Sequence, residues 1–98
     1  MSEFDGQKQR NALTAVEQAL RSLGAGQSDR ARKNAANAAD LDQIDAYQSF
    51  VAAAESAADD IDAAGLVSAA TWDAIALALE PGPLRFLVDD IRSTTNAG

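Results

Sequence analysis

The sequence predicts an all-α protein with about five short helices, which form two helical hairpins plus a C-terminal capping helix in a compact bundle. Apolar residues recur in steps of three and four along the chain, which is the spacing of one face of an α-helix, and no segment has the pattern of a β-strand. The length of 98 residues suits one domain. We therefore expect a single all-α domain over residues 1–92 and a flexible C-terminal tail at residues 93–98.

The first helix is predicted by four large apolar residues that share one stripe: Leu13, Val16, Leu20 and Leu23. Ser2 is a suitable N-cap, because its hydroxyl can accept a hydrogen bond from a free N–H of the first turn. At the other end, Gly24 or Gly26 can adopt the left-handed conformation that ends many helices. The first helix is therefore expected between Ser2 and these glycines.

The second helix is predicted to begin near Ser28 and Asp29, and its apolar side has only alanine: Ala31, Ala35 and Ala38. Alanine has the highest intrinsic helix propensity, and its small side chain lets a neighbouring helix approach closely. We expect this helix to be a spacer that packs tightly on its neighbours and supplies little core volume. Whether alanine contacts alone dock it firmly stays open at this point.

The third helix has the clearest periodicity in the chain, with steps of three and four through Ile44, Tyr47, Val51, Ala54, Ala58 and Ile61. Asp42 is expected to be its N-cap. Asp45 comes three residues later, in the first turn, where the helix dipole stabilises a carboxylate. Gly65 is expected to end this helix.

The sequence "EPGP" at residues 80–83 separates the last two helices, because a residue before proline avoids helical geometry. Ser68 is expected to cap the fourth helix, whose apolar side has Trp72, Ile75, Ala76 and Leu79. Pro83 suits the first turn of the fifth helix, whose apolar side has Leu84, Leu87, Val88 and Ile91. We interpret Trp72 as a core residue, since a single tryptophan at helical spacing is usually buried.

The hydrophobic core has few large residues to draw on. Of the 98 residues, 23 are alanine, and a buried alanine removes far less apolar area from water than a leucine does. The core is expected to consist of the larger apolar side chains: Phe4, Leu13, Val16, Leu20, Leu23, Leu41, Ile44, Tyr47, Phe50, Val51, Ile61, Leu66, Trp72, Ile75, Leu77, Leu79 and the apolar residues from Leu84 through Ile91. This set suffices for a monomer of marginal stability, or for a dimer that shares part of the core.

A weak internal repeat relates the two predicted hairpins. The segment "NALTAVEQALRS", residues 11–22, aligns with "DAYQSFVAAAES", residues 45–56, at an offset of 34 residues. The helices that follow these segments align at an offset of 40 residues. Alanine-rich segments also match by chance, so both a duplication and a coincidence stay open.

The composition argues against an enzyme and against a metal protein. The chain has no histidine and no cysteine, which removes the usual general base near neutral pH, the thiol nucleophile and common ligands of transition metals. Asp40, Asp42 and Asp45 begin like a calcium loop, but the later ligand positions hold residues that do not fit. No glycine-rich phosphate loop is present. We therefore predict a non-enzymatic protein with no cofactor and no metal.

The net charge of −7 is unevenly distributed along the chain. Residues 1–33 have six basic and four acidic residues, a net charge of +2, whereas residues 34–98 have two basic and eleven acidic residues, a net charge of −9. An acidic surface repels phosphate backbones, so we expect no nucleic acid as a partner. The chain has no apolar segment long enough to span a membrane and no secretory signal, so we also expect no membrane partner and a cytoplasmic location.

Four residues are candidates for contact with a protein partner. Asp59, Asp60 and Asp62 lie at the C-terminal end of the third helix, where like charge opposes the helix dipole at a cost of about 0.3–1 kcal/mol each. Phe86 lies off the apolar stripe of the fifth helix, so its ring could contact a partner. The alternatives are a solvated helix end for the aspartates and a wider apolar face that includes Phe86.

The sequence therefore favours a small, acidic helical module for protein–protein interaction. Its acidic surface would steer it to a basic protein partner, or to the basic segment "RARK" at residues 30–33 of a second copy, and salt would weaken this attraction. The alternative is a structural or homo-oligomeric subunit whose thin core is completed by self-association.

Overall fold

The computed structural model describes residues 3–79 and 84–96, and this part of the chain folds into five α-helices. The helices are α1 (Glu3–Gly24), α2 (Ser28–Leu41), α3 (Asp45–Ala64), α4 (Ala69–Ala78) and α5 (Leu84–Asn96). No strand occurs in the described residues. The predicted all-α class and the number of helices are confirmed.

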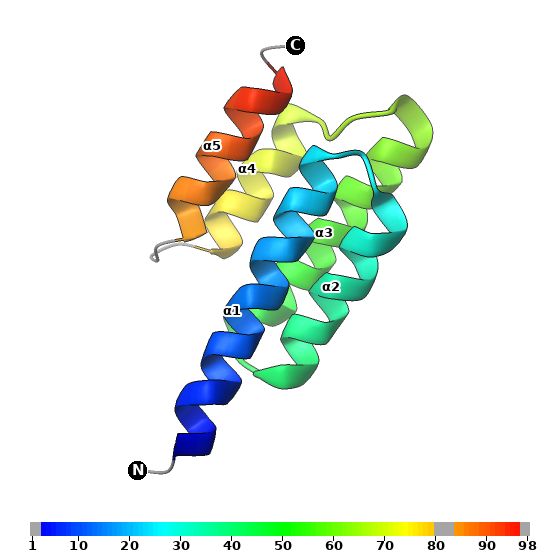
Figure 1. Ribbon diagram of the computed structural model, residues 1–98. Coiled ribbons are helices and arrows are strands. Elements are labelled where there is room, and N and C mark those ends of the chain that lie inside the picture. The colour runs from blue at the N-terminus through cyan, green and yellow to red at the C-terminus, as the bar shows by residue number, and fades with distance from the viewer. Residues whose placement is uncertain (1–2, 80–83, 97–98) are drawn as a thin grey trace.

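The helices form a ring in which each packs against the next. α1 packs along α2, α2 along α3 and α3 along α4, while α5 lies against both α4 and α1 and closes the ring (Figure 1). α1 also contacts α3 across the interior. The two predicted hairpins are therefore α1–α2 and α3–α4, and α5 is the capping helix between them.

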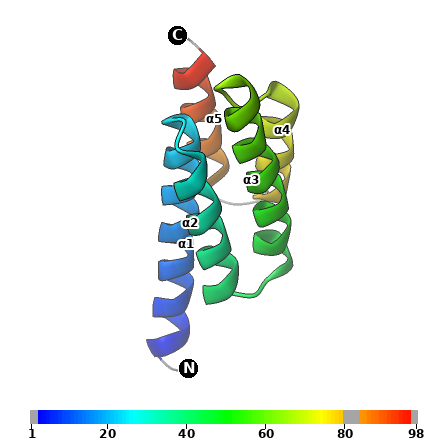
Figure 2. The ribbon, with the colours of Figure 1, turned by 90° about the vertical axis from the view of Figure 1, so that its right-hand side faces the viewer.

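α1 is the longest helix, and its first turns extend past the end of α2 (Figure 2). The molecule measures 45 × 23 × 19 Å along its principal axes. Ser2, the predicted N-cap, lies outside the described residues. At the other end, Gly26 has a φ of 76° and the N–H of Gln27 donates to the carbonyl of Ser22 at 2.8 Å, which is the Schellman arrangement. Gly26, and not Gly24, is therefore the left-handed glycine after α1.

The connection between α2 and α3 differs from the prediction. Asp42 does not cap α3, because it directly follows α2 and its N–H donates to the carbonyl of Ala38 at 3.1 Å. Ile44 holds the N-cap position of α3, where its side chain has no oxygen to accept a hydrogen bond. Asp45 lies in the first turn of α3, as predicted. Gly65 ends α3 with a φ of 85°, also as predicted.

The start of α4 agrees with the prediction, whereas α5 ends further along the chain than predicted. Ser68 caps α4, since its Oγ accepts a hydrogen bond from the N–H of Thr71 at 3.3 Å. The expected helix break at residues 80–83 lies outside the described residues. α5 continues to Asn96, so residues 93–96, which we expected in the tail, form its last turn.

The core lies inside the ring and combines large and small side chains. The largest fully buried side chains among the described residues are Trp72, Phe50, Leu20, Leu23, Ile75, Val16, Val67 and Val88. Trp72 is therefore a core residue, as predicted. Alanine also contributes on three helices: Ala12, Ala15 and Ala19 on α1, Ala31, Ala35 and Ala38 on α2, and Ala54, Ala57 and Ala58 on α3 are at most 3 % exposed.

Five residues that we expected in the core are exposed instead: Leu13, Ile44, Leu66, Leu77 and Phe86, with exposed fractions of 37, 43, 53, 71 and 78 %. Leu13 is the exposed member of its stripe on α1, since Val16, Leu20 and Leu23 are at most 2 % exposed. Ile44 and Leu66 lie in the connections at the two ends of α3. Leu77 lies roughly 140° around α4 from the buried Trp72, at 100° per residue.

Candidate functional site: the acidic α3–α4 hairpin

The three predicted aspartates at the end of α3 do not form one open acidic site, because each has a partner in the same chain. Nη2 of Arg32, on α2, donates to Oδ1 of Asp59 at 2.6 Å and to Oδ2 of Asp62 at 2.9 Å. Asp62 also accepts a hydrogen bond from Oγ of Ser28 at 2.6 Å. These four residues, which we name the Arg32 link, join the start of α2 to the end of α3.

Asp60 serves the start of α4 instead. Its Oδ2 accepts hydrogen bonds from the N–H of Ser68 at 3.1 Å, from Oγ of Ser68 at 2.9 Å and from Oγ1 of Thr71 at 2.7 Å. Since Ser68 is itself the N-cap of α4, Asp60 holds the capping residue in place. We name this group of three residues the Asp60 cap.

The hydrogen bonds of the Asp60 cap and of the Arg32 link lower the pKa of the carboxyl groups that accept them. The Thr71 hydroxyl, and after it Ser68, holds the pKa of Asp60 below the ordinary value of an aspartate. The Ser28 hydroxyl, and after it the Arg32 guanidinium, does the same for the pKa of Asp62. Both carboxyl groups are therefore ionised at neutral pH, which is the form that these contacts need.

The crowding of like charge at the end of α3 thus has a structural role. α2 supplies the cation for two of the aspartates, and the start of α4 supplies hydrogen-bond donors for the third. The side chains of Asp59 and Asp62 are still 75 and 53 % exposed, so their charge also faces solvent. A contact of these aspartates with a partner protein stays a prediction.

A groove open to solvent runs between α3 and α4. It has a volume of about 520 Å³, and small side chains dominate its lining: Ala46, Ser49, Ala52, Ala53 and Ser56 from α3, with Ala74, Leu77 and Ala78 from α4. Leu77 is the large apolar residue of this set, and it is 71 % exposed. The small side chains leave room for a partner to approach the backbones of both helices closely.

The groove lies in acidic surroundings. α3 and α4 have no lysine and no arginine. Four exposed carboxylates lie one helical turn from a groove residue on the same helix: Asp45, Glu55, Asp59 and Asp73. Arg92 of α5 binds Asp73 at 2.6 Å and Arg32 of α2 binds Asp59 at 2.6 Å, so these two ion pairs neutralise part of this charge. The groove therefore offers an apolar contact with acidic flanks.

Phe86, the fourth predicted contact residue, is 78 % exposed on α5. It does not line the groove between α3 and α4. The groove and Phe86 are therefore separate candidates, and a partner contact at Phe86 stays a prediction.

Sequence reasoning missed two features of this site. The exposure of Leu77 could have been predicted, because Leu77 lies off the stripe of Trp72, Ile75 and Leu79. The same argument identified Phe86 as a candidate contact residue. The contacts of Arg32 could not have been predicted, because its partners lie 27 and 30 residues further along the chain and only the packing of α2 on α3 brings them together.

In the part of the chain that the structure describes, no group of three or more acidic side chains could hold a metal ion. The same residues include no helix with the length and apolar character needed to cross a membrane.

Comparison of the chain with protein-family models, with curated proteins and with solved structures gave no match.

Proposed function

We propose that the protein is a non-enzymatic interaction module whose α3–α4 groove binds an amphipathic helix of a protein partner. This partner helix would have basic residues beside its apolar side. The observation that supports this is Leu77, a large apolar side chain that is 71 % exposed at a groove lined otherwise by alanine and serine. Covering such a side chain removes apolar area from water, and a groove between two helices suits a third helix.

Charge around the groove supports a basic partner. Asp45, Glu55, Asp59 and Asp73 lie one helical turn from groove residues, and the two helices of the groove have no positive charge of their own. Lysine or arginine on the partner helix would pair with these carboxylates and steer the approach. Because the carboxylates are exposed, salt would screen this attraction. The proposal keeps the cytoplasmic location that the sequence predicts.

A second candidate function is that of a structural or homo-oligomeric subunit. Two exposed large side chains, Leu77 and Phe86, favour it, because a second copy of the chain could cover them. Pairing two copies through the α3–α4 groove would bring two acidic surfaces together, however, and like charges across an interface are destabilising. We therefore prefer a basic partner.

The proposal can be tested by titrating the isotope-labelled protein with two synthetic helical peptides. Both have leucines at helical spacing; one has lysine on its polar side and the other has glutamate. We expect the lysine peptide to shift the amide resonances of Ala52, Ser56, Ala74 and Leu77, and to bind more weakly as salt rises. Leu77→Gln should weaken its binding about tenfold or more, since burial of a leucine contributes about 1.5–3 kcal/mol.

Leu66→Gln is the matched control. It removes a leucine that is also exposed, at 53 %, but that does not line the groove. Equal binding of the two peptides, or an equal loss of affinity in the two variants, would contradict the proposal. A dimer seen by light scattering in the unmodified protein and lost in Leu77→Gln would favour the second candidate function instead.

A further inference from the structure

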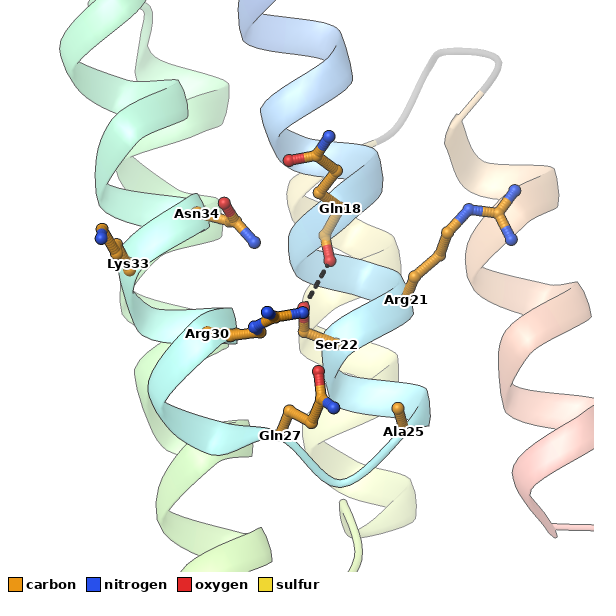
Figure 3. A pocket seen from close by; sticks show the side chains of 8 residues that line it. All are labelled: Gln18, Arg21, Ser22, Ala25, Gln27, Arg30, Lys33 and Asn34. Carbon is orange, nitrogen blue, oxygen red and sulfur yellow. Dashed lines mark hydrogen bonds between the residues drawn. The ribbon is translucent and has the colours of Figure 1, made fainter.

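We propose that a second site, between α1 and α2, binds a small soluble phosphate ester with hydroxyl groups, such as a sugar phosphate. A depression of about 610 Å³ lies where α1 ends and α2 begins (Figure 3). Its polar lining comes from three residues of α1, from the residue before α2 and from three residues of α2: Gln18, Arg21 and Ser22, then Gln27, then Arg30, Lys33 and Asn34. The site is distinct from the α3–α4 groove, which shares no residue with it.

The charge of this depression is opposite to that of the chain as a whole. Three basic residues line it and no acidic residue does, although the chain has 15 acidic and 8 basic residues. Arg21 is neutralised by Glu17, at 3.0 Å. Arg30 and Lys33 form no ion pair with a described residue, so two positive charges remain for a ligand.

The arrangement of these two cations also favours an anion. Arg30 and Lys33 are three residues apart on α2, which places like charges on the same side of the helix and destabilises it. In Figure 3 Arg30 extends from α2 toward Ser22 on α1, while Lys33 lies at the outer edge of the depression. Arg30 is therefore the cation that extends into the depression, and Lys33 adds positive charge at its edge.

The lining residues also define the class of the ligand. A guanidinium donates two parallel hydrogen bonds to a phosphate group, and an ammonium adds a positive charge. The amides of Gln18, Gln27 and Asn34 can each donate and accept, which suits hydroxyl groups on the rest of the ligand. No aromatic or large apolar side chain lines the depression, so it offers nothing that would stack on a base or cover an acyl chain.

The size of the ligand follows from the charge of the whole molecule. A net charge of −7 repels nucleic acids and anionic membranes, which present many negative charges over a wide area. A ligand with a single phosphate group meets mainly the local positive charge of Arg30 and Lys33. The depression therefore suits a small soluble phosphate ester better than either polyanion.

The test is a titration of the labelled protein with inorganic phosphate, glucose 6-phosphate and glucose at constant ionic strength. We expect both phosphates to shift the amide resonances of Gln27, Arg30 and Asn34 and to saturate. Glucose 6-phosphate should bind several-fold more tightly than inorganic phosphate, and glucose alone should give no shift. Arg30→Gln should weaken the binding of glucose 6-phosphate about tenfold, through loss of charge-assisted hydrogen bonds.

Arg10→Gln is the matched control, because Arg10 is exposed on α1 and does not line the depression. Lys33→Gln gives a second variant of the site, and thermal unfolding checks that each variant is folded. Equal weakening by Arg10→Gln and Arg30→Gln, or shifts spread over the whole surface without saturation, would overturn the proposal. Binding to vesicles that contain phosphatidylserine, with no response to either soluble phosphate, would overturn it too and assign the site to a membrane.

Discussion

Helices α2 and α4 hold equivalent places, each as the second helix of its hairpin, yet they are held by different means. α2 has 14 residues and buries only alanine: Ala31, Ala35, Ala38 and Ala39. α4 has 10 residues and buries Trp72, Ile75 and Ala76. The start of α2 has no side-chain cap, whereas Ser68 and Asp60 cap the start of α4.

The difference shows that a helix can be docked either by the burial of large side chains or by the close packing of small ones. Buried alanine contributes little apolar area, so α2 depends on close contact with its neighbours and on the Arg32 link at its start. α4 depends on the large area that Trp72 buries. We therefore expect the protein to lose stability when buried atoms are removed from α4 and when atoms are added to the buried face of α2.

The largest effect is expected at α4. Trp72→Ala should lower the free energy of unfolding by about 3–5 kcal/mol, because it leaves a cavity at a fully buried position. Urea unfolding followed by far-UV circular dichroism measures this change. Leu77→Ala, at an exposed position on the same helix, should change the free energy by no more than about 0.5 kcal/mol. Similar losses in the two variants would mean that Trp72 does not dock α4.

The next effect is expected at α2 and has the opposite cause. Ala35 is fully buried, so Ala35→Leu should lower the free energy of unfolding by about 1–3 kcal/mol, because the larger side chain forces the helices apart. Ala36→Leu adds the same atoms at an exposed position and should stay within about 0.5 kcal/mol. The same urea experiment compares them. If Ala35→Leu proves neutral, α2 is not docked by close fit.

A smaller effect is expected at the Asp60 cap, and it depends on pH. The pKa of Asp60 is lowered in the folded protein. The contribution of its carboxylate to the free energy of unfolding is therefore fully present above the pKa of the unfolded chain, about 3.9, and is lost as pH falls through the folded pKa. Asp60→Asn should therefore destabilise the protein at pH 7 by no more than about 1 kcal/mol, since solvent screens the carboxylate.

Urea unfolding of the unmodified protein and of Asp60→Asn, from pH 7 down to about pH 2.5, tests this expectation. The two curves should converge below about pH 4, where the carboxyl group becomes protonated. A difference that stays constant across this range would show that the charge of Asp60 does not stabilise the start of α4.

The smallest effect is expected at the Arg32 link. Arg32→Gln removes the cation that binds Asp59 and Asp62, all of which are in contact with solvent. We expect a small decrease in melting temperature at low salt that disappears at about 1 M NaCl, where the Debye length is about 3 Å. Arg10→Gln, which removes an exposed cation outside the link, should leave the melting temperature unchanged at both salt concentrations. A decrease that persists at high salt would mean that Arg32 acts through packing.

The sequence predicts those features of the fold that depend on local geometry. The left-handed Gly65 and the N-cap Ser68 follow from the end of one hydrophobic stripe and the start of the next, and both are confirmed. Features that depend on which helices meet could not be predicted in this way. Leu13 is exposed although the other members of its stripe are buried, and Arg32 meets its aspartates only because α2 packs on α3.

The ring that α5 closes also bears on the order of folding. Each hairpin forms from contacts between neighbours in the sequence, which assemble quickly. α5 must instead reach α1 across most of the chain, which has a larger entropic cost, so Val88 and Ile91 are expected to enter the core late. During synthesis, residues 84–96 leave the ribosome after the other helices. Until then, the sides of α1 and α4 that α5 covers are exposed, and we expect chaperones to bind the chain at that stage.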